Sequence, residues 1–132
     1  MRSASQLLEA HLDLMTRDFD RWKALFAPDA VMEFVYGASA HVDSPLVGIE
    51  AIAKSVKGFL NAVTDFQHGP LTIRKIEGEQ AVLGEFSADA RVRKTGRHYH
   101  QDYAIYVRAQ DGRIAFYREY FDPARIVAAF ED

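Results

Sequence analysis

The sequence predicts an α+β fold in which helices gather on one face of a single antiparallel sheet. Apolar residues recur at helical spacing in the first half of the chain, whereas the second half consists of runs rich in β-branched and aromatic residues. Glycine-containing turns separate these runs at Glu77–Glu79, Thr95–Gly96 and Asp111–Gly112. Strands joined in this way pair as antiparallel neighbours, and the helices cover them. A curved sheet around a long helix makes a cone whose open end suits a small ligand.

Two helices are predicted before the first strand. Residues 5–18 place three apolar side chains on one helix face, namely Leu8, Leu12 and Met15. A second, shorter helix has Asp20 as its expected N-cap, and its apolar side consists of Trp22, Leu25 and Phe26. We expect Pro28 and Asp29 to end this helix, because proline does not continue a helix. The β-branched and aromatic run Val31–Tyr36 then predicts the first strand.

A loop and the main helix follow. Residues 37–47 show no periodicity and predict a loop of the kind that often forms the rim of a pocket. The helix after Gly48 has the clearest apolar stripe of the chain, formed by Ile49, Ile52, Val56, Phe59, Leu60 and Val63. Four strands are predicted next, at Leu71–Ile76, Gln80–Arg93, His98–Arg108 and Arg113–Phe121. Asp122 and Pro123 open a short final helix, since Asp caps helices and Pro suits their first position.

Length and composition narrow the possible functions. The 132 residues predict one domain spanning residues 1–132, and the chain has no cysteine for disulfides, thiolate ligands or a nucleophile. A net charge of −3 argues against a nucleic-acid partner. No apolar run approaches the roughly 18 residues of a membrane helix, and no glycine-rich phosphate loop follows a strand. We therefore expect a cytoplasmic protein with no cofactor and no nucleic-acid or membrane partner.

Glu119 is the strongest candidate for a catalytic acid or base. Because side chains alternate along a strand, Glu119 shares one face with Tyr117 and Phe121. A carboxylate among aromatic rings loses solvation, which raises its pKa and suits it to proton transfer near neutral pH. The alternative is an ion pair at the rim with Arg118 or Arg113.

The strand His98–Arg108 carries a second candidate set. His98, His100 and Asp102 point to one face, where a carboxylate would orient an imidazole and raise its basicity. A partial metal site and ordinary surface polarity are the alternatives. The opposite face carries Tyr103, and the sequence leaves open which face lines the cone.

Further candidates lie near the end of the first strand. Tyr36 is positioned to donate a hydrogen bond to a developing enolate, as phenols do in oxyanion sites. His41, in the following loop, is either a base on a lid or an exposed loop residue. Aromatic residues of the core or of the pocket wall are expected to include Trp22, Phe34 and Phe59.

Two parts of the chain resemble a known family. They are Phe26–Val31, before the first strand, and the ending formed by Asp111–Ile114 and Arg118–Pro123. Together with the order of elements they resemble the SnoaL-like branch of the ketosteroid isomerase / nuclear transport factor 2-like superfamily, over nearly the whole chain. The resemblance implies a cone-shaped, cystatin-like α+β fold, a deep apolar pocket and a homodimer through the outer sheet face. Members include isomerases, polyketide cyclases, epoxide hydrolases and phenazine-biosynthesis proteins, so the fold alone does not select a reaction.

The resemblance transfers to individual positions unevenly. Glu119 matches a pocket carboxylate of the phenazine-biosynthesis and epoxide-hydrolase relatives, and Glu85 resembles an acidic position of the former. Phe34 stands where steroid isomerases carry their proton-abstracting Asp, and Ser55 where phenazine relatives carry a His. The Arg-x-Asp pair of the epoxide hydrolases is replaced here by Phe86 and Ala88.

The sequence thus predicts a small-molecule pocket protein, specifically a cofactor-independent isomerase or cyclase-type enzyme that performs acid–base chemistry on an apolar carbonyl compound. The catalytic candidates are Glu119, Asp102, His100 and Tyr36. The ligand-binding candidates are Trp22, Phe34, Ser55, Phe59, Glu85, Tyr103 and Tyr117, with no metal ligand among them. The alternative is a non-catalytic ligand-binding or dimerisation module of the same fold.

Overall fold

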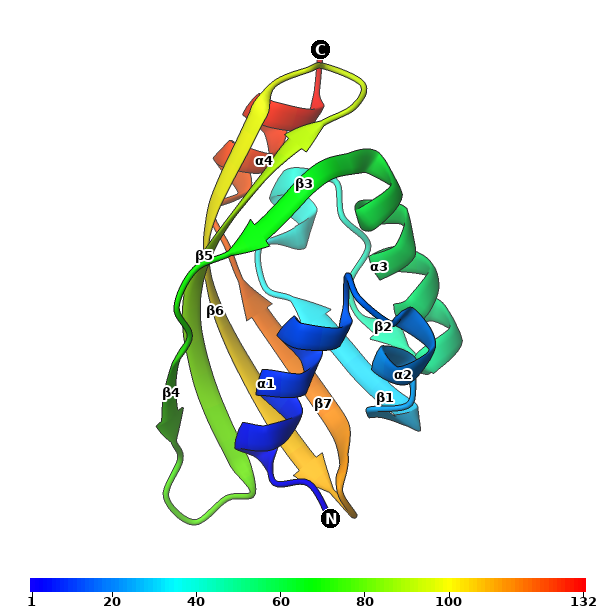
Figure 1. Ribbon diagram of the computed structural model, residues 1–132, viewed down its shortest axis with the longest axis vertical. Helices are drawn as coiled ribbons and strands as arrows, with labels where there is room; N and C mark the ends of the chain where they lie inside the picture. Colours follow the sequence, from blue (N-terminus) through cyan, green and yellow to red (C-terminus); the bar gives the residue numbers. More distant parts are fainter.

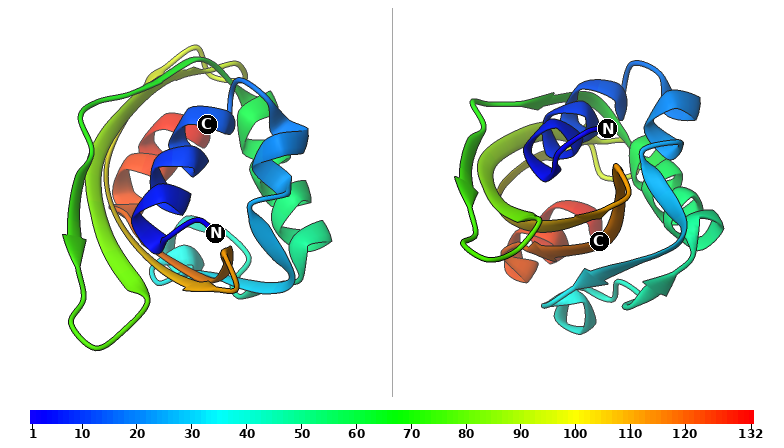
Figure 2. Two further views of the ribbon diagram at one scale, coloured as in Figure 1. Left: turned by 60° about the horizontal axis from the view of Figure 1, so that its bottom comes forward. Right: turned by 90° about the horizontal axis from the view of Figure 1, so that it is seen from below.

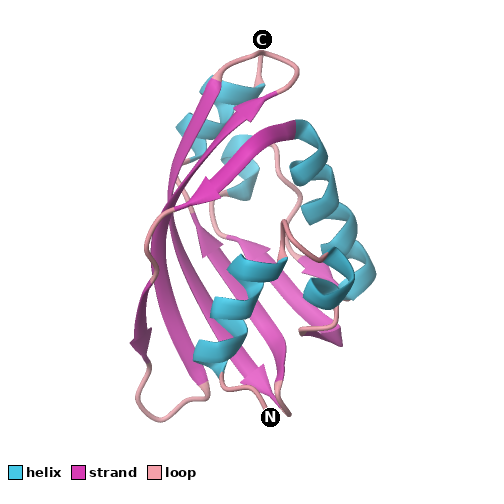
Figure 3. Cartoon of the chain, in the orientation of Figure 1, coloured by secondary structure: helices cyan, strands magenta, loops and turns pink.

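The computed structural model describes residues 1–132 and shows one strongly curved sheet with helices against its concave side (Figures 1 and 3). The helices are α1 (Ala4–Leu14), α2 (Phe19–Lys23), α3 (Ile49–Ala62) and α4 (Pro123–Phe130), with a 3₁₀ turn at Gly37–Ala40. The strands are β1 (Phe26–Phe34), β2 (Leu46–Val47), β3 (Val63–His68), β4 (Thr72–Lys75), β5 (Ala81–Val92), β6 (His98–Gln110) and β7 (Arg113–Tyr120). Seen from below, the sheet curls around α1, and α3 lies across the interior from the curved strands (Figure 2).

The strand order is β2-β1-β7-β6-β5-β3, and β4 also pairs with β5. The long strands β5, β6 and β7 form the predicted antiparallel meander. In contrast, β1 pairs with β7 in parallel, which corrects the expectation of a purely antiparallel sheet. A hairpin forces antiparallel pairing, but β1 meets β7 only after most of the chain has intervened, so either direction was available.

The boundaries of α2 and β1 differ from the predicted ones. The N-cap of α2 is Asp18, whose carboxylate accepts a hydrogen bond from the backbone N–H of Arg21, and Asp20 lies inside the helix. The strand β1 starts at Phe26 and therefore contains Pro28, which was expected to end the helix. Proline is tolerated there because neither neighbouring strand pairs with Pro28, since β2 pairs only with the later part of β1 and the register with β7 shifts between Phe26 and Val31.

Two strands were not predicted, namely the two-residue β2, which lies at the end of the expected loop, and β3. The helix α3 ends at Ala62, and Val63, whose apolar side chain continued the helical stripe, has an extended backbone and begins β3. Asp65 has a positive φ of 57°, and the pairing register of β3 with β5 shifts between Thr64 and Gln67. This irregularity breaks the alternation of side chains by which a strand is recognised in a sequence.

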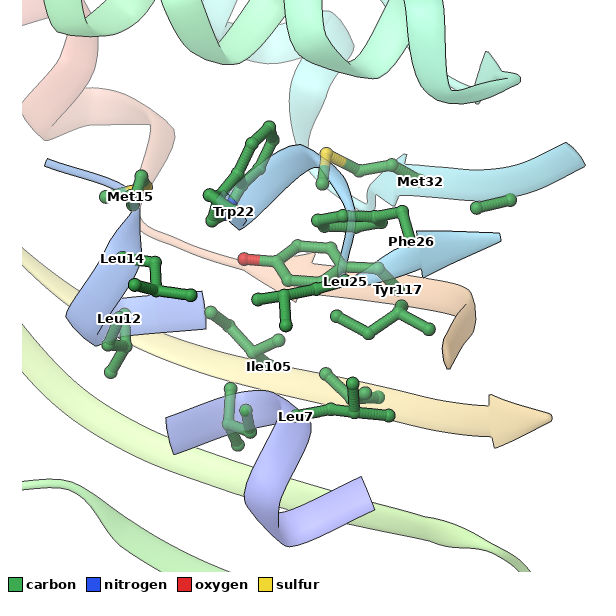
Figure 4. Packing of buried hydrophobic residues seen from close by; sticks show 14 of the residues in the cluster. Leu7, Leu12, Leu14, Met15, Trp22, Leu25, Phe26, Met32, Ile105 and Tyr117 are labelled. Atoms are coloured by element: carbon green, nitrogen blue, oxygen red, sulfur yellow. The ribbon is translucent and has the colours of Figure 1, made fainter. Parts of the chain in front are cut away.

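The main hydrophobic core lies between α1 and the concave face of the sheet (Figure 4). A capping box between Ser3 and Gln6 starts α1, and Leu7 and Leu8 are fully buried against the strands. Gly84 on β5 makes this approach possible, because a Cβ atom at that position would overlap the side chain of Leu8. A smaller cluster beneath α4 contains Val63, Ala90, Val92, Tyr99 and Ala129. None of the helices is long and apolar enough to cross a membrane.

Candidate functional site

A cavity of about 620 Å³ lies between α1, α3 and the concave face of the sheet. This volume is in the range of small-molecule sites. Of its 23 lining residues, 16 are hydrophobic, so a mainly apolar ligand would fit it best. The aromatic walls are formed by Phe34, Phe59, Phe66, Phe86, Tyr103 and Phe121.

Glu119 is a carboxylate in the wall of this cavity. It lines the cavity together with Tyr117 and Phe121, as alternation along β7 predicted. The hydroxyl of Tyr117 donates a hydrogen bond of 2.8 Å to Oε1 of Glu119. Burial raises the pKa of Glu119 from 4.5 to about 7, although the hydrogen bond from Tyr117 acts in the opposite direction. A carboxyl group with this pKa can give or take a proton near neutral pH.

A buried histidine stands behind Tyr117. His11 on α1 is only 3% exposed, and its Nδ1 accepts a hydrogen bond of 2.8 Å from the indole N–H of Trp22. Its Nε2 lies 3.2 Å from the hydroxyl oxygen of Tyr117, and Figure 4 shows that hydroxyl pointing toward the side where Trp22 lies. Burial lowers the pKa of His11 to about 4, so the ring is neutral at physiological pH.

His11 was not among the residues selected from the sequence, although a signal was present. It follows Leu8 by three positions and precedes Met15 by four, which puts it on the apolar stripe of α1. A histidine on such a stripe must be buried and therefore needs hydrogen-bond partners. Those partners, Trp22 and Tyr117, come from α2 and β7, and only the folded chain brings them together.

Two phenols on β6 add hydrogen-bond donors to the same cavity. The hydroxyl groups of Tyr99 and Tyr103 are 2.8 Å apart. Burial raises the pKa of Tyr99 to about 12 and that of Tyr103 well above its usual value, so both groups keep their protons. One O–H bond serves the contact between the two phenols, which leaves the other for a ligand. Ile105 is paired with Glu119 across the strands, so Tyr103 is a diagonal neighbour of Glu119 on the same face.

The structure decides which face of β6 lines the cavity. Tyr99, Gln101 and Tyr103 point inward, and the alternate positions occupied by His98, His100 and Asp102 point outward. The structure therefore does not bring His100 and Asp102 to Glu119, and the two residues are no longer candidates for chemistry in this cavity. The physical reason is the alternation of side chains, which sends the two aromatic rings into the cone and the charged groups to solvent.

On the outer face these polar residues form a network. Oδ1 of Asp89 lies 2.9 Å from both Nε2 of His98 and Nδ1 of His100. Asp102 accepts hydrogen bonds from Ser87 at 2.6 Å and from Arg125 at 3.0 Å. The bond from Ser87 and the charge of Arg125 lower the pKa of Asp102, which therefore remains ionised. No group of three or more His, Asp or Glu side chains is arranged to bind a metal ion.

The remaining predicted residues divide between cavity and exterior. Tyr36 is 49% exposed beyond the end of β1 and does not line the cavity. Glu85 is also outside, on the outer face of β5, where it forms an ion pair with Arg74 at 3.0 Å. Trp22 is fully buried behind the cavity, where it contacts His11. The residues that do line the cavity are Phe34, Ser55, Phe59, Tyr103 and Tyr117.

Polar residues gather on the α3 and loop side of the cavity. The predicted loop contributes His41 and Asp43, and α3 contributes Lys54 and Ser55. His41 has a left-handed backbone with φ of 58°, and its exposed imidazole lies 3.4 Å from the carboxylate of Glu131. The predicted loop therefore does form part of the cavity wall.

Comparison with known proteins agrees with this architecture. A model of the SnoaL-like domain matches residues 8–117. The chain is 28% identical over 128 residues to a PhzA/B-like protein of Pseudomonas aeruginosa, covering 96% of this chain and 89% of that one. A crystal structure of a presumptive isomerase from Bacillus subtilis superposes with a TM-score of 0.87 at 28% identity, covering 96% and 91%. An NTF2-like protein from Burkholderia xenovorans LB400 superposes with a TM-score of 0.80 at 21% identity, covering 97% and 95%.

The chain thus has the NTF2-like fold, in which a curved sheet and its helices enclose an apolar cavity. Among proteins with this fold, the chain belongs to the SnoaL-like domain family. This family assignment agrees with the resemblance seen in the sequence.

Proposed function

We propose that this protein is an enzyme that moves a proton on a small, largely apolar carbonyl compound, as an isomerase or a cyclase does. The observation that carries the proposal is the position of Glu119, a carboxyl group with a pKa of about 7 in the wall of an apolar cavity. A catalytic acid or base works best when its pKa lies near the working pH.

The proposed reaction uses Glu119 together with the phenol pair. The carboxylate of Glu119 takes a proton from the carbon next to the carbonyl group, and the electrons of that C–H bond move onto the carbonyl oxygen to form an enolate. The hydroxyl hydrogen that Tyr99 and Tyr103 do not use between themselves is donated to the enolate oxygen. The protonated carboxyl group then returns its proton to a carbon of the same molecule, so no cofactor takes part.

The surroundings of Glu119 support this assignment. The aromatic walls exclude water, which would otherwise solvate the carboxylate and lower its pKa. The description of the Bacillus subtilis structure as a presumptive isomerase agrees with proton transfer as the class of reaction.

Hydrogen–deuterium exchange tests the proposal without knowledge of the natural product. We would incubate a panel of enolisable cyclic and aryl ketones with the protein in deuterated water and follow loss of the α-proton signal by NMR. For a ketone that binds, we expect catalysed exchange that falls at least about 100-fold in Glu119→Gln. Glu85→Gln, which removes a carboxylate outside the cavity, is the matched control and should exchange at the wild-type rate. Equal exchange by wild type and Glu119→Gln would refute the proposal.

A second candidate function is non-catalytic binding of an apolar ligand. The hydrophobic majority of the lining residues favours it, since such a cavity binds apolar molecules without any reaction. Under this alternative, ketones that bind would show no catalysed exchange in either the wild type or the variant. Their binding would still be detected as a rise in melting temperature.

We also propose that the protein forms a homodimer through the outer face of the sheet. That face carries half-buried aromatic side chains, including Phe116 on β7 beside Tyr106 on β6, with ring centroids 6.0 Å apart. Apolar rings on an open sheet face favour cover by another surface. Light scattering across a dilution series should give twice the mass of the chain, and a constant monomer mass would contradict the dimer.

A further inference from the structure

We infer that Trp22 and His11 are positioning residues, which act through Tyr117 to direct a hydrogen bond onto Oε1 of Glu119 and leave Oε2 as the oxygen that exchanges protons with a ligand. The inference deepens the proposed function and rests on it for its catalytic meaning. It rests on the geometry of four side chains, two from the helices α1 and α2 and two from the strand β7, which form one continuous hydrogen-bonded series.

The direction of the series is set at Trp22. An indole N–H can only donate a hydrogen bond, so Nδ1 of His11, at 2.8 Å, must be an unprotonated acceptor. A neutral imidazole has one proton, which therefore resides on Nε2. Trp22 is fully buried and has no alternative partner in water, so this choice of tautomer is enforced at all times.

The tautomer of His11 in turn determines the hydrogen bond that Glu119 receives. Nε2–H of His11 donates to the hydroxyl oxygen of Tyr117 at 3.2 Å, so the single proton of that hydroxyl is free to point the other way. The acceptor in that direction is Oε1 of Glu119, at 2.8 Å. Oε2 accepts no hydrogen bond from the protein, and no fully buried side-chain nitrogen or oxygen is left without a partner, so Oε2 is the oxygen open to the cavity.

The charge of His68 on β3, which does not line the cavity, adds to the effect of burial on the pKa of His11. The buried ionisable groups that line the cavity with Glu119 are Tyr117 on its own strand, Tyr99 and Tyr103 on β6, and His11 on α1. All four are neutral at physiological pH, because burial raises the pKa of each phenol and lowers that of the imidazole. The other titratable residues of the lining are His41, Asp43 and Lys54.

Substitution of Trp22 removes the N–H group that fixes the tautomer of His11 and with it the direction of the hydrogen bonds. In Trp22→Phe, Nδ1 of His11 has no donor, so the ring can carry its proton there and present Nε2 as an acceptor. The hydroxyl of Tyr117 is then able to donate to His11 and no longer to Glu119. When a carboxylate loses a hydrogen bond, the pKa of the carboxyl group rises, and its two oxygens become equivalent sites for the proton.

Nuclear magnetic resonance tests this directly in the intact protein. ¹⁵N shifts of His11 distinguish a protonated from an unprotonated ring nitrogen, and ¹³C shifts of the Glu119 carboxyl group follow its titration. In the wild type we expect the His11 proton on Nε2. In Trp22→Phe we expect part of the population to carry it on Nδ1, with the pKa of Glu119 rising from about 7 to about 8 or above.

Two further variants separate positioning from packing. Phe26→Leu loosens the same cluster, since the Phe26 ring lies 4.9 Å from that of Trp22, but removes no hydrogen bond and should leave the titration of Glu119 unchanged. His11→Gln keeps an acceptor for Trp22 and a donor for Tyr117 in a side chain that does not titrate, and should retain a Glu119 pKa near the wild-type value.

Each result either supports or overturns the inference. A wild-type His11 with its proton on Nδ1 would overturn it, and this measurement needs no variant if Trp22→Phe does not fold. An unchanged Glu119 titration in folded Trp22→Phe would also overturn it. Failure of the proposed function is seen separately, as ketone exchange that survives in Glu119→Gln. The NMR measurements can therefore support the positioning inference while the exchange assay refutes the proposed reaction, or the exchange assay can support the reaction while NMR refutes the inference.

Discussion

Tyr117 and Glu119 lie two residues apart on β7 and are joined by a hydrogen bond of 2.8 Å from the phenol to Oε1 of the carboxylate. Two residues is the period of a strand, so both side chains enter the cavity from the same face. The bond favours the charged form of Glu119, and burial favours the neutral form; the burial effect is the larger of the two. The carboxyl group therefore retains its proton to a pH far above that of an ordinary glutamate.

The stability of the protein should depend on the protonation of Glu119. The folded pKa of about 7 lies above the ordinary value of 4.5, so the folded state binds the proton more tightly than the unfolded state does. The contribution of Glu119 to stability is then fully present below pH 4.5 and falls by about 3 kcal/mol as the pH rises to 7. We expect Glu119→Gln to be more stable than wild type at pH 8 by up to this amount and similar at pH 4, as measured by urea denaturation. Equal stability at pH 8 would show that the carboxylate is not desolvated.

His11 should contribute a dependence of the opposite sign. Its pKa of about 4 in the folded state lies below the ordinary 6.5, so the unfolded state binds the proton more tightly. This contribution is present above pH 6.5 and falls by about 3 kcal/mol as the pH drops to 4. We expect the stability of His11→Gln, which keeps both hydrogen bonds, to increase relative to that of wild type as the pH falls from 6.5 to 4. Parallel curves for the two proteins between pH 4 and 6.5 would contradict a buried neutral imidazole.

Between pH 4.5 and 6.5 the effects of Glu119 and His11 oppose each other, so their combined contribution in the wild type should be nearly flat. Each single variant should show how the free energy of unfolding depends on pH because of the one group that remains. Stability should rise with pH in Glu119→Gln and fall with pH in His11→Gln. The same urea series at several pH values measures both, and slopes of equal sign would contradict the pair of assignments.

Tyr103 provides a test of the oxygen-binding part of the proposed reaction. Tyr103→Phe removes one of the two paired phenols, so the remaining Tyr99 has lost its partner. We expect ketone exchange to fall roughly 10- to 100-fold, since the pair that directs one hydroxyl hydrogen toward the developing oxyanion has been broken. Tyr106→Phe is the control, because its phenol faces outward and donates to Glu79 at 2.6 Å. Equal losses in both variants would indicate a general effect on folding.

Gly84 tests how closely α1 packs on the sheet. Gly84→Ala places a methyl group where the side chain of Leu8 lies, and such overpacking destabilises cores by about 1–3 kcal/mol. Gly58→Ala is the matched control, since nothing lies within 4 Å of a Cβ atom there and alanine favours the helix. We expect opposite changes in the denaturation midpoint. If Gly84→Ala is neutral, α1 is less tightly packed than the structure indicates.

Much of the site could be predicted from local patterns. The alternation around Glu119 placed it on one face with Tyr117 and Phe121, and these three do line the cavity. The unpatterned segment at residues 37–47 was expected at a pocket rim, and His41 and Asp43 are in the lining. Both inferences needed only the neighbours of a residue along the chain.

Other features required the tertiary structure. The sequence could not say which face of His98–Arg108 turns inward, because both faces carry aromatic and polar side chains. The register with β5 and β7 decides it, which sends Tyr103 into the cavity and Asp102 outside. Tyr36 was likewise expected near the ligand, but the turn after β1 places it in solvent.

The sequence by itself determined the fold class, the position of the long helix and the acidic residue most suited to the cavity. Those properties follow from the spacing of apolar and aromatic side chains within one segment. Only the tertiary structure decided that Trp22, His11 and Tyr117 stand in series behind Glu119. Tyr117 lies 106 positions from His11 in the chain. A hydrogen bond between such distant residues leaves no periodic trace, because it depends on where packing brings two separate elements together.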